Sequence, residues 1–120
     1  LLDKISDIAM TRAALGDDTI IGVVCTHKGD IDAAIGQGVD YGVLCPDAGL
    51  IAAWKVKTDA LCIVRGQAIT NANCGDYVRY GADFVDVSGY ILKHEKGIMQ
   101  GTVNILHAID VAVEPPGIVN

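Results

Sequence analysis

GADFVDVSG at residues 81–89 and GVDYGVL at residues 38–44 are the two stretches that decide the fold. In each, a glycine ends a predicted helix, an aspartate opens a predicted strand, and an aromatic residue is expected to enter the interior. The two stretches begin 43 residues apart. That distance is twice the spacing of the predicted strands, so both are interpreted as the same step of a repeated strand-plus-helix unit.

The rest of the chain repeats this unit. The predicted strands are short runs rich in Val, Ile and Leu, which is typical of parallel strands covered on both faces. We predict strands over residues 19–25, 41–45, 61–64 and 84–88, and helices over 1–15, 30–37, 48–57, 71–80 and 97–113. The strands begin at intervals of about 20 to 23 residues, as expected for βα units joined by right-handed crossovers.

The chain is expected to form a single α/β domain over residues 1–120. Four such units make about half of a (β/α)8 TIM-type barrel, which usually takes about 200 to 250 residues. A half barrel leaves its first and last strands with open edges. Because residue 1 is Leu and already reads as helix, we expect either that further residues precede it or that the chain forms a homo-oligomer.

Composition and charge narrow the class of protein. Hydrophobic residues make up 51 % of the chain and charged residues 20 %, which fits a soluble globular domain. A net charge of −6, with nine Lys plus Arg and no basic run, argues against nucleic acid as a partner. No apolar run reaches the length of a membrane span or a secretory segment, so a cytoplasmic location is expected.

The four cysteines do not form a metal or disulfide pattern. Cys25, Cys45, Cys62 and Cys74 are separated by 20, 17 and 12 residues, without any CxxC pair. The first three lie in predicted strands among aliphatic residues, where a free cysteine behaves as a small hydrophobic side chain. We therefore predict that they are core residues.

A candidate site is predicted where the strands end, because parallel βα sheets bind ligands at the carboxyl ends of their strands. Ser88 and Gly89 are small residues whose amides could approach an anion at the start of the following helix. A simple tight turn explains them equally well. Arg65 and residues 66–70 follow the neighbouring strand, and the last two barrel loops often bind one phosphate together.

Other polar residues give weaker signals. Thr70 or Asn71 is expected to cap a helix, and His27 could act as an acid, a base or a phosphate ligand after the first strand. His94 and His107 are expected on helices, away from the strand ends. Trp54 is expected to pack its helix against the sheet.

The order ITNAN at residues 69–73, a helix, and GADFVDVSG at residues 81–89 resembles the second half of thiamine-phosphate synthases and their relatives. The similarity runs from about Ala13 to Ile109. It implies a (β/α)8 barrel that joins a pyrimidine diphosphate to a thiazole phosphate and releases pyrophosphate, with Mg²⁺ on the diphosphate. This chain would supply about four C-terminal units, and the magnesium ligands would lie in the other half.

The same resemblance implies a phosphate held by backbone amides of two turns. One turn contains Val87, Ser88 and Gly89. The other contains Gln67 and Ala68, where the family usually has two glycines. The expected partners are therefore small phosphorylated metabolites.

The resemblance also places Cys25, Thr26 and His27 near the diphosphate, while no catalytic residue and no metal ligand is assigned in this chain. Val24 stands where the family usually has a serine, and CPDAGLIAAWK at residues 45–55 stands in place of a Thr- and Lys-rich loop. Two hypotheses follow. The chain belongs to a thiamine-phosphate synthase-like transferase and is inactive alone, or it is a non-catalytic relative that binds a phosphorylated metabolite or acts only in assembly.

Overall fold

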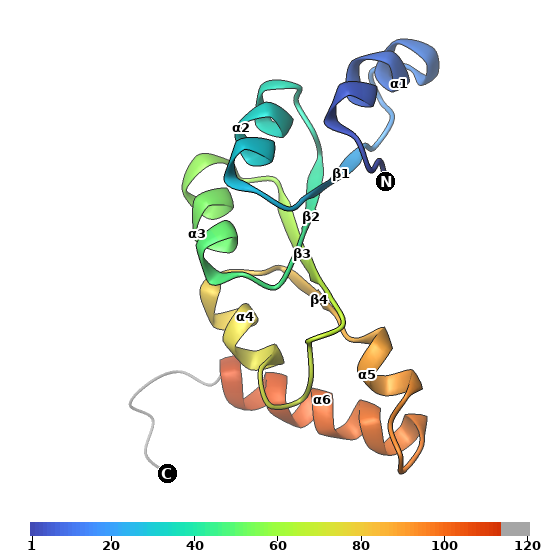
Figure 1. Ribbon diagram of the computed structural model, residues 1–120, viewed down its shortest axis with the longest axis vertical. Coiled ribbons are helices and arrows are strands. Elements are labelled where there is room, and N and C mark those ends of the chain that lie inside the picture. Colours follow the sequence, from blue (N-terminus) through green and yellow to red (C-terminus); the bar gives the residue numbers. More distant parts are fainter. Residues whose placement is uncertain (114–120) are drawn as a thin grey trace.

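A computed structural model of the protein describes residues 1–113 and contains one parallel sheet of four strands. The strands are β1 Gly22–Cys25, β2 Tyr41–Leu44, β3 Leu61–Arg65 and β4 Phe84–Asp86. They lie side by side in chain order, and every neighbouring pair is parallel (Figure 1). The predicted α/β class with four parallel strands is confirmed.

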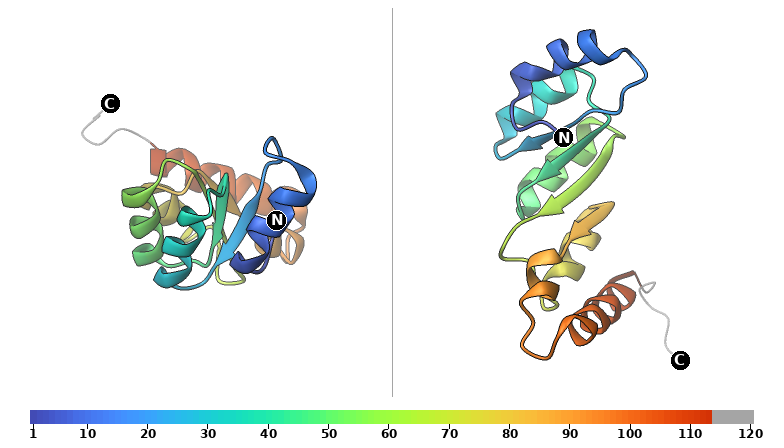
Figure 2. Two further views of the ribbon diagram at one scale, coloured as in Figure 1. Left: turned by 90° about the horizontal axis from the view of Figure 1, so that it is seen from above. Right: turned by 90° about the vertical axis from the view of Figure 1, so that its right-hand side faces the viewer.

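Helices connect the strands as crossovers and extend the chain beyond the sheet. They are the 3-10 helix η1 Ile5–Asp7 and the α-helices α1 Ile8–Leu15, α2 Lys28–Gly36, α3 Ala48–Lys57, α4 Cys74–Tyr80, α5 Ser88–Leu92 and α6 Ile98–Val113. Helices α2, α3 and α4 cover one face of the sheet, whereas α1 lies beyond β1 and α6 beyond β4 (Figures 1 and 2). The described helices include none that is long and apolar enough to cross a membrane.

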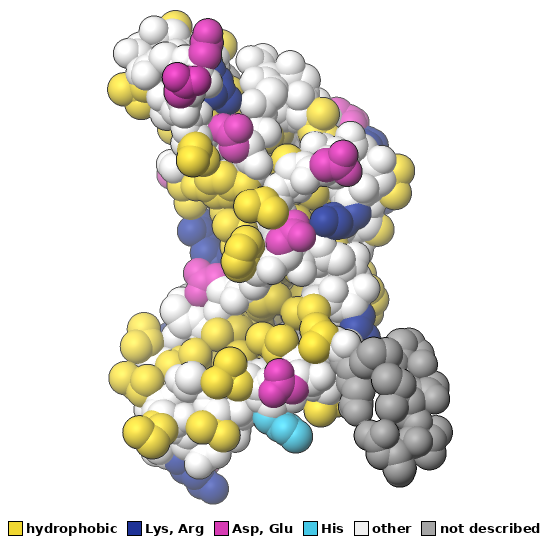
Figure 3. Space-filling view, turned by 180° about the vertical axis from the view of Figure 1, so that it is seen from behind, with side chains coloured by type: hydrophobic (Ala, Val, Ile, Leu, Met, Phe, Trp, Pro, Cys, Tyr) yellow, Lys and Arg dark blue, Asp and Glu magenta, His cyan; other side chains and the backbone are white. Residues whose placement is uncertain are grey.

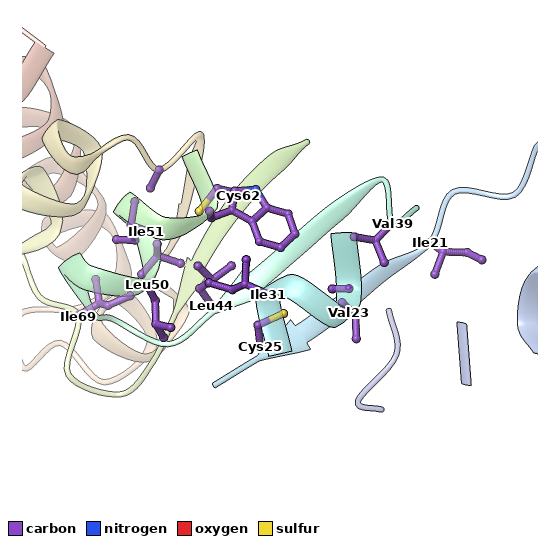
Figure 4. Packing of buried hydrophobic residues seen from close by; sticks show 14 of the residues in the cluster. Ile21, Val23, Cys25, Ile31, Val39, Leu44, Leu50, Ile51, Cys62 and Ile69 are labelled. Carbon is purple, nitrogen blue, oxygen red and sulfur yellow. The ribbon is translucent and has the colours of Figure 1, made fainter. Parts of the chain in front are cut away.

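The core lies between the sheet and the helices α2 and α3. Val23, Cys25, Leu44 and Cys62 project from the strands into this layer and are buried, with Ile31 of α2 packed among them (Figure 4). All four cysteines are free. The predicted core role is confirmed for Cys25 and Cys62, whereas Cys45 is only half-buried.

Trp54 of α3 is fully buried and packs that helix against β2, as predicted. Its Nε1 donates a hydrogen bond to the Ala60 carbonyl at 2.8 Å. Gly42 of β2 makes room for the indole, since a Cβ at this position would lie 2.5 Å from Trp54 Cη2. A glycine is therefore required beneath the ring.

The two predicted repeat stretches have the same local structure. Asp40 Oδ2 accepts the Ile21 N–H at 2.7 Å, and Asp83 Oδ2 accepts the Cys62 N–H at 2.8 Å. In return, the Asp40 N–H donates to the Ile21 carbonyl at 2.8 Å, and the Asp83 N–H donates to the Cys62 carbonyl at 2.9 Å. Each aspartate thus joins the start of its own strand to the strand before it.

The first four residues are not helical, so that part of the prediction is wrong. Leu2 instead lies parallel to β1, where its N–H donates to the Gly22 carbonyl at 2.8 Å and its carbonyl accepts the Val24 N–H at 2.9 Å. Leu2 pairs with the outer edge of β1 because the backbone N–H and C=O groups on this edge would otherwise lack hydrogen-bond partners.

The predicted last strand is too long. In the structure, β4 ends at Asp86, and Ser88 begins the short helix α5. The side chain of Asp86 turns the chain at this point by accepting the Ser88 N–H, which a continuing strand would not allow. The first predicted strand is also too long, because β1 begins at Gly22, three residues after the predicted start at Thr19.

The second face of the sheet is not covered by helices. In the right-hand view of Figure 2 the strands lie in front of the helices α2, α3 and α4. Residues that alternate with the core point to this side, and we call the surface made by Val24, Tyr41, Leu61, Ile63 and Phe84 the open face. Phe84 was expected in the interior but is 57 % exposed, because nothing in the described chain packs over it.

Candidate functional site

A cavity of about 240 Å³ lies at the carboxyl ends of β3 and β4. Its lining residues are Arg65, Gly66, Gln67, Asp86, Ser88 and Gly89. The structure therefore brings together both segments that the sequence pointed to. Gln67, Ser88 and Gly89 line the cavity itself, while Ala68 and Val87 are not among its lining residues.

The loop after β3 is held in place by the ITNAN segment. Asn73 Nδ2 donates to the Ala68 carbonyl at 2.8 Å, and Asn73 Oδ1 accepts the Thr70 N–H at 2.8 Å. Thr70 Oγ1 in turn accepts the Ala72 N–H at 3.2 Å. The expectation that Thr70 or Asn71 caps a helix is corrected, because these bonds close a turn and α4 begins only at Cys74.

Gly66 and Gly89 lie on opposite walls of the cavity, and only Gly66 is tightly packed. A Cβ on Gly66 would lie 2.5 Å from Pro46 Cγ, so this residue must be glycine for the loops after β2 and β3 to meet. On the other wall, Gln67 Oε1 lies 3.6 Å from the position of a Cβ on Gly89. The side chain of Gln67 thus bridges the two walls.

Asp86 is the residue of this site that sequence reasoning missed. Its Oδ1 accepts the Ser88 N–H at 3.0 Å and the Ser88 hydroxyl at 2.7 Å. The Ser88 N–H lowers the pKa of Asp86 most, and the Ser88 hydroxyl and the Arg65 charge lower it further, against an opposing effect of burial. The carboxylate is therefore charged at neutral pH and occupies the amide expected to hold a phosphate. The sequence did contain a signal for this turn, because an aspartate two residues before the start of a helix often accepts the backbone N–H at that start.

Arg65 is the cation of the cavity. It is exposed and is paired in register with Asp86 on the neighbouring strand. Among residues 1–113, no hydrogen bond or ion pair holds its guanidinium group. This group is therefore free to donate to an incoming anion.

The segment after β1 does not contribute to the cavity. The N–H groups of Thr26 and His27 both donate to Asp30 Oδ2, each at 3.1 Å, and so begin α2. Cys25 points into the core, where burial raises the pKa of its thiol to about 11. A role of these residues near a diphosphate stays a prediction from the resemblance.

The remaining histidines lie outside the cavity. His94 was expected on a helix but lies in the turn between α5 and α6, where its Nδ1 accepts the Lys96 N–H at 3.1 Å. Its ring also packs edge to face on Tyr90, with centroids 5.2 Å apart. His107 lies exposed on α6, as expected.

The described residues do not assemble a magnesium site. Within residues 1–113, no three side chains of His, Cys, Asp or Glu lie close enough together to hold a metal ion. Asp86 is the one acidic side chain that lines the cavity, and Ser88 already engages one of its oxygens. Magnesium ions usually need several oxygen ligands in octahedral geometry, so Mg²⁺ stays an expectation from the resemblance.

Comparison with known proteins relates the chain to others through its fold. No family model and no curated protein sequence matches it. Thiamine phosphate pyrophosphorylase from Pyrococcus furiosus is similar in structure, with 15 % identity and a TM-score of 0.73 over 88 % of this chain and 55 % of that chain. The Amycolatopsis orientalis BexX/CysO complex is also similar, with 11 % identity and a TM-score of 0.76 over 97 % of this chain and 52 % of that chain. A native KDPGal structure has 16 % identity and a TM-score of 0.68 over 90 % of this chain and 56 % of that chain.

The chain spans about half the length of each of these solved structures. At such low identity the likeness concerns the fold alone. The four parallel strand-plus-helix units therefore show a distant fold relationship to thiamine phosphate pyrophosphorylase and to other TIM-barrel-like proteins.

Proposed function

We propose that the cavity between β3 and β4 binds the phosphate group of a small metabolite, within a thiamine-phosphate synthase-like transferase. The observation that carries this proposal is the position of the free Arg65 guanidinium beside the cavity that Gln67, Ser88 and Gly89 also line. Thiazole phosphate is the first candidate ligand, because the family resemblance names it and a structural neighbour is a thiamine phosphate pyrophosphorylase.

The chemistry of the lining favours an anion of modest size. A guanidinium group offers several N–H donors in a planar fork, and backbone N–H groups at a turn add further donors. Most sites for drug-sized ligands enclose roughly 300 to 1,000 Å³, so a cavity of about 240 Å³ suits a phosphate group better than a whole large substrate.

Asp86 sets the condition for binding. Its carboxylate holds the Ser88 N–H, so a phosphate can take this donor only when the side chain of Asp86 turns aside. Gly89 provides a second lining backbone position. A bound phosphate would therefore replace the carboxylate of Asp86 as the acceptor of the Ser88 N–H at the start of α5.

In the proposed reaction, a nitrogen of the thiazole phosphate forms a bond to the methylene carbon of a hydroxymethylpyrimidine diphosphate, and the carbon–oxygen bond to pyrophosphate breaks. The cavity would orient the thiazole by its phosphate. No side chain of this chain is assigned a catalytic step. The second candidate is a binder without turnover, which is favoured by the departure of residues 45–55 from the Thr- and Lys-rich loop of the family.

Titration calorimetry with thiazole phosphate, inorganic phosphate and the unphosphorylated thiazole alcohol tests the binding step. We expect both phosphates to bind, the alcohol not to bind, and Arg65→Ala to weaken binding at least tenfold. Arg79→Ala is the matched control, because Arg79 is an exposed arginine of α4 outside this cavity. Equal affinity in the Arg65→Ala variant, or no binding of any phosphate by the unaltered protein, would refute the site.

A separate assay addresses turnover. Release of pyrophosphate from the two substrates supports the transferase, whereas binding without pyrophosphate release supports the second candidate. Both readouts use the same protein preparation, so that a loss of binding and a loss of turnover can be told apart.

A further inference from the structure

The cavity at the ends of β3 and β4 presents an acceptor as well as donors. Asp86 Oδ1 is engaged by the N–H and the hydroxyl group of Ser88. Among residues 1–113, no hydrogen bond or ion pair engages Asp86 Oδ2, and none engages the guanidinium group of Arg65 in register on β3. Within this part of the chain, an anion that enters the cavity therefore meets a free cation beside a free carboxylate oxygen.

The charges of the cavity stay constant over the pH range in which a phosphate ester titrates. The Ser88 N–H lowers the pKa of Asp86 most, and the charge of Arg65 lowers it further, so the carboxylate is ionised above about pH 5. Arg65 stays protonated throughout. The rest of the lining is uncharged and consists of Gly66, Gln67, Ser88 and Gly89. A phosphate ester, in contrast, loses its second proton at about pH 6.

A carboxylate beside an anion distinguishes ligands by whether they carry a proton. A phosphate ester below about pH 6 keeps one P–OH group, which can donate a hydrogen bond to a free oxygen of Asp86. Hydrogen bonds to an ionised acceptor are about twice as strong as those between neutral groups. A sulfate ester of the same shape and charge has no proton to donate, so the same carboxylate only repels it.

We propose that Asp86 makes this cavity selective for a phosphate group that keeps a proton, and against sulfate and fully ionised phosphate. The inference rests on the phosphate site proposed above. Arg65 attracts every anion, whereas Asp86 determines which anion is accepted. The selectivity does not depend on which group holds the Ser88 N–H, because Asp86 keeps at least one free oxygen in either arrangement.

The surface outside the cavity does not supply this selectivity. Figure 3 shows charged side chains of both signs scattered among hydrophobic ones over one face of the molecule. The net charge of −6 repels phosphate and sulfate esters of equal charge alike. Discrimination between two such anions therefore has to come from hydrogen bonding inside the cavity.

Methyl phosphate and methyl sulfate are the probes that test the inference. At about pH 5.5 each carries mainly one negative charge, and methyl phosphate alone has a proton to donate. Nitrogen-15 chemical-shift titrations that follow the amide signals of Ser88 and Gly89 measure both affinities. We expect the unaltered protein to bind methyl phosphate at least tenfold more tightly than methyl sulfate at this pH.

The same titrations at about pH 8 give a second readout. Methyl phosphate has then lost the proton that Asp86 accepts, so its affinity should fall at least threefold from pH 5.5 to pH 8. A site made of cations and backbone amides alone would instead prefer the dianion. Methyl sulfate does not titrate in this range, so any change in its affinity reports on the protein and serves as the correction.

Asp86→Asn is the test variant. An asparagine can turn either its oxygen or its NH₂ group toward a ligand, so it should accept both anions about equally and reduce the preference to less than about threefold. Its affinity for methyl phosphate should rise from pH 5.5 to pH 8, because Arg65 attracts the dianion more strongly. Asp76→Asn removes the same charge from α4 outside the cavity and should keep the preference of the unaltered protein.

Two results would overturn the inference and leave the anion site in place. One is equal affinity of the unaltered protein for methyl phosphate and methyl sulfate at pH 5.5, a comparison that needs no variant. The other is an undiminished preference in Asp86→Asn, with spectra that show a retained fold. If neither anion shifts the Ser88 and Gly89 signals in any variant, the proposed phosphate site itself is refuted, and the inference with it.

Discussion

Replacing Asp86 by asparagine should tighten the binding of phosphate. In the structure, Asp86 Oδ1 lies 3.0 Å from the Ser88 nitrogen and 2.7 Å from the Ser88 hydroxyl oxygen. A phosphate oxygen that takes this N–H must replace the carboxylate oxygen. Even when the side chain of Asp86 turns aside, its negative charge stays near the phosphate, and we take about 4 Å as the separation of the two charges.

The size of the effect follows from this distance. Two unit charges at about 4 Å interact by about 1 kcal/mol in water, so a phosphate with two negative charges is repelled by about 2 kcal/mol. Partial screening by salt reduces this value. Removing the charge should therefore improve the affinity roughly 5- to 30-fold, since 1.4 kcal/mol corresponds to a factor of ten.

Two substitutions separate charge from competition for the amide. Asp86→Asn removes the charge but keeps an oxygen that can accept the Ser88 N–H, whereas Asp86→Ala removes both. We expect the affinity to increase from the unaltered protein to Asp86→Asn, and to be at least as high in Asp86→Ala. Calorimetry with inorganic phosphate at about 50 and 300 mM salt should show a smaller gain at the higher salt concentration.

Asp76→Asn is the control, because it removes one negative charge from α4 outside the cavity. A general effect of net charge would change the affinity equally in Asp76→Asn and Asp86→Asn. If Asp86→Asn binds phosphate no better than the unaltered protein, the carboxylate does not compete with the ligand and the reasoning fails.

Three further predictions concern the reactivity of the cysteines and the stability of the fold. Cys45 should react with a thiol reagent at pH 8 long before Cys25, because burial raises the pKa of Cys25 to about 11, and Cys45→Ser should abolish the fast phase of labelling. Gly42→Ala should lower the free energy of unfolding in urea by about 1 to 3 kcal/mol, because the added methyl group would overlap the ring of Trp54. Asp83→Ala should cost about 1 to 3 kcal/mol in the same urea assay, since it leaves a strand N–H without its acceptor; unchanged unfolding midpoints would contradict the last two.

The repeated unit could be predicted from the sequence because it rests on local chemistry. Gly38 and Gly81 have φ values of +71° and +114°, a conformation that glycine adopts without cost, and each ends a helix as predicted. Asp40 and Asp83 each follow such a glycine by two residues and make matching hydrogen bonds. Residue type and spacing were sufficient here.

Other features depend on neighbours that a local pattern does not contain. The helix α5 has five residues, which is too short to show a helical period. Leu2 fits a helical pattern with Ile5 and Ile8, but the unpaired edge of β1 outweighs that preference. The exposure of Phe84 depends on what covers the sheet, because an aromatic residue in a strand suits either face.

The cavity could be located from the sequence, but its charge balance could not. The rule that sites lie at strand ends pointed to Gln67, Ser88 and Gly89, and all three line the cavity. The rule says nothing about which strand residue points toward the ligand. Asp86 does so because it alternates with Val85, which faces the helices.

Arg65 and Asp86 project to the same side of the sheet as the open face, so covering that face would also change the surroundings of the cavity. With the face exposed to water, attraction of a phosphate by Arg65 and repulsion by Asp86 nearly cancel at about 1 kcal/mol per charge pair. A partner that excludes water lowers the effective dielectric constant, and near a protein surface the same pair at 4 Å interacts by about 4 kcal/mol. Both terms grow together, so anything that excludes water from this side of the sheet should enlarge the affinity gained by Asp86→Asn.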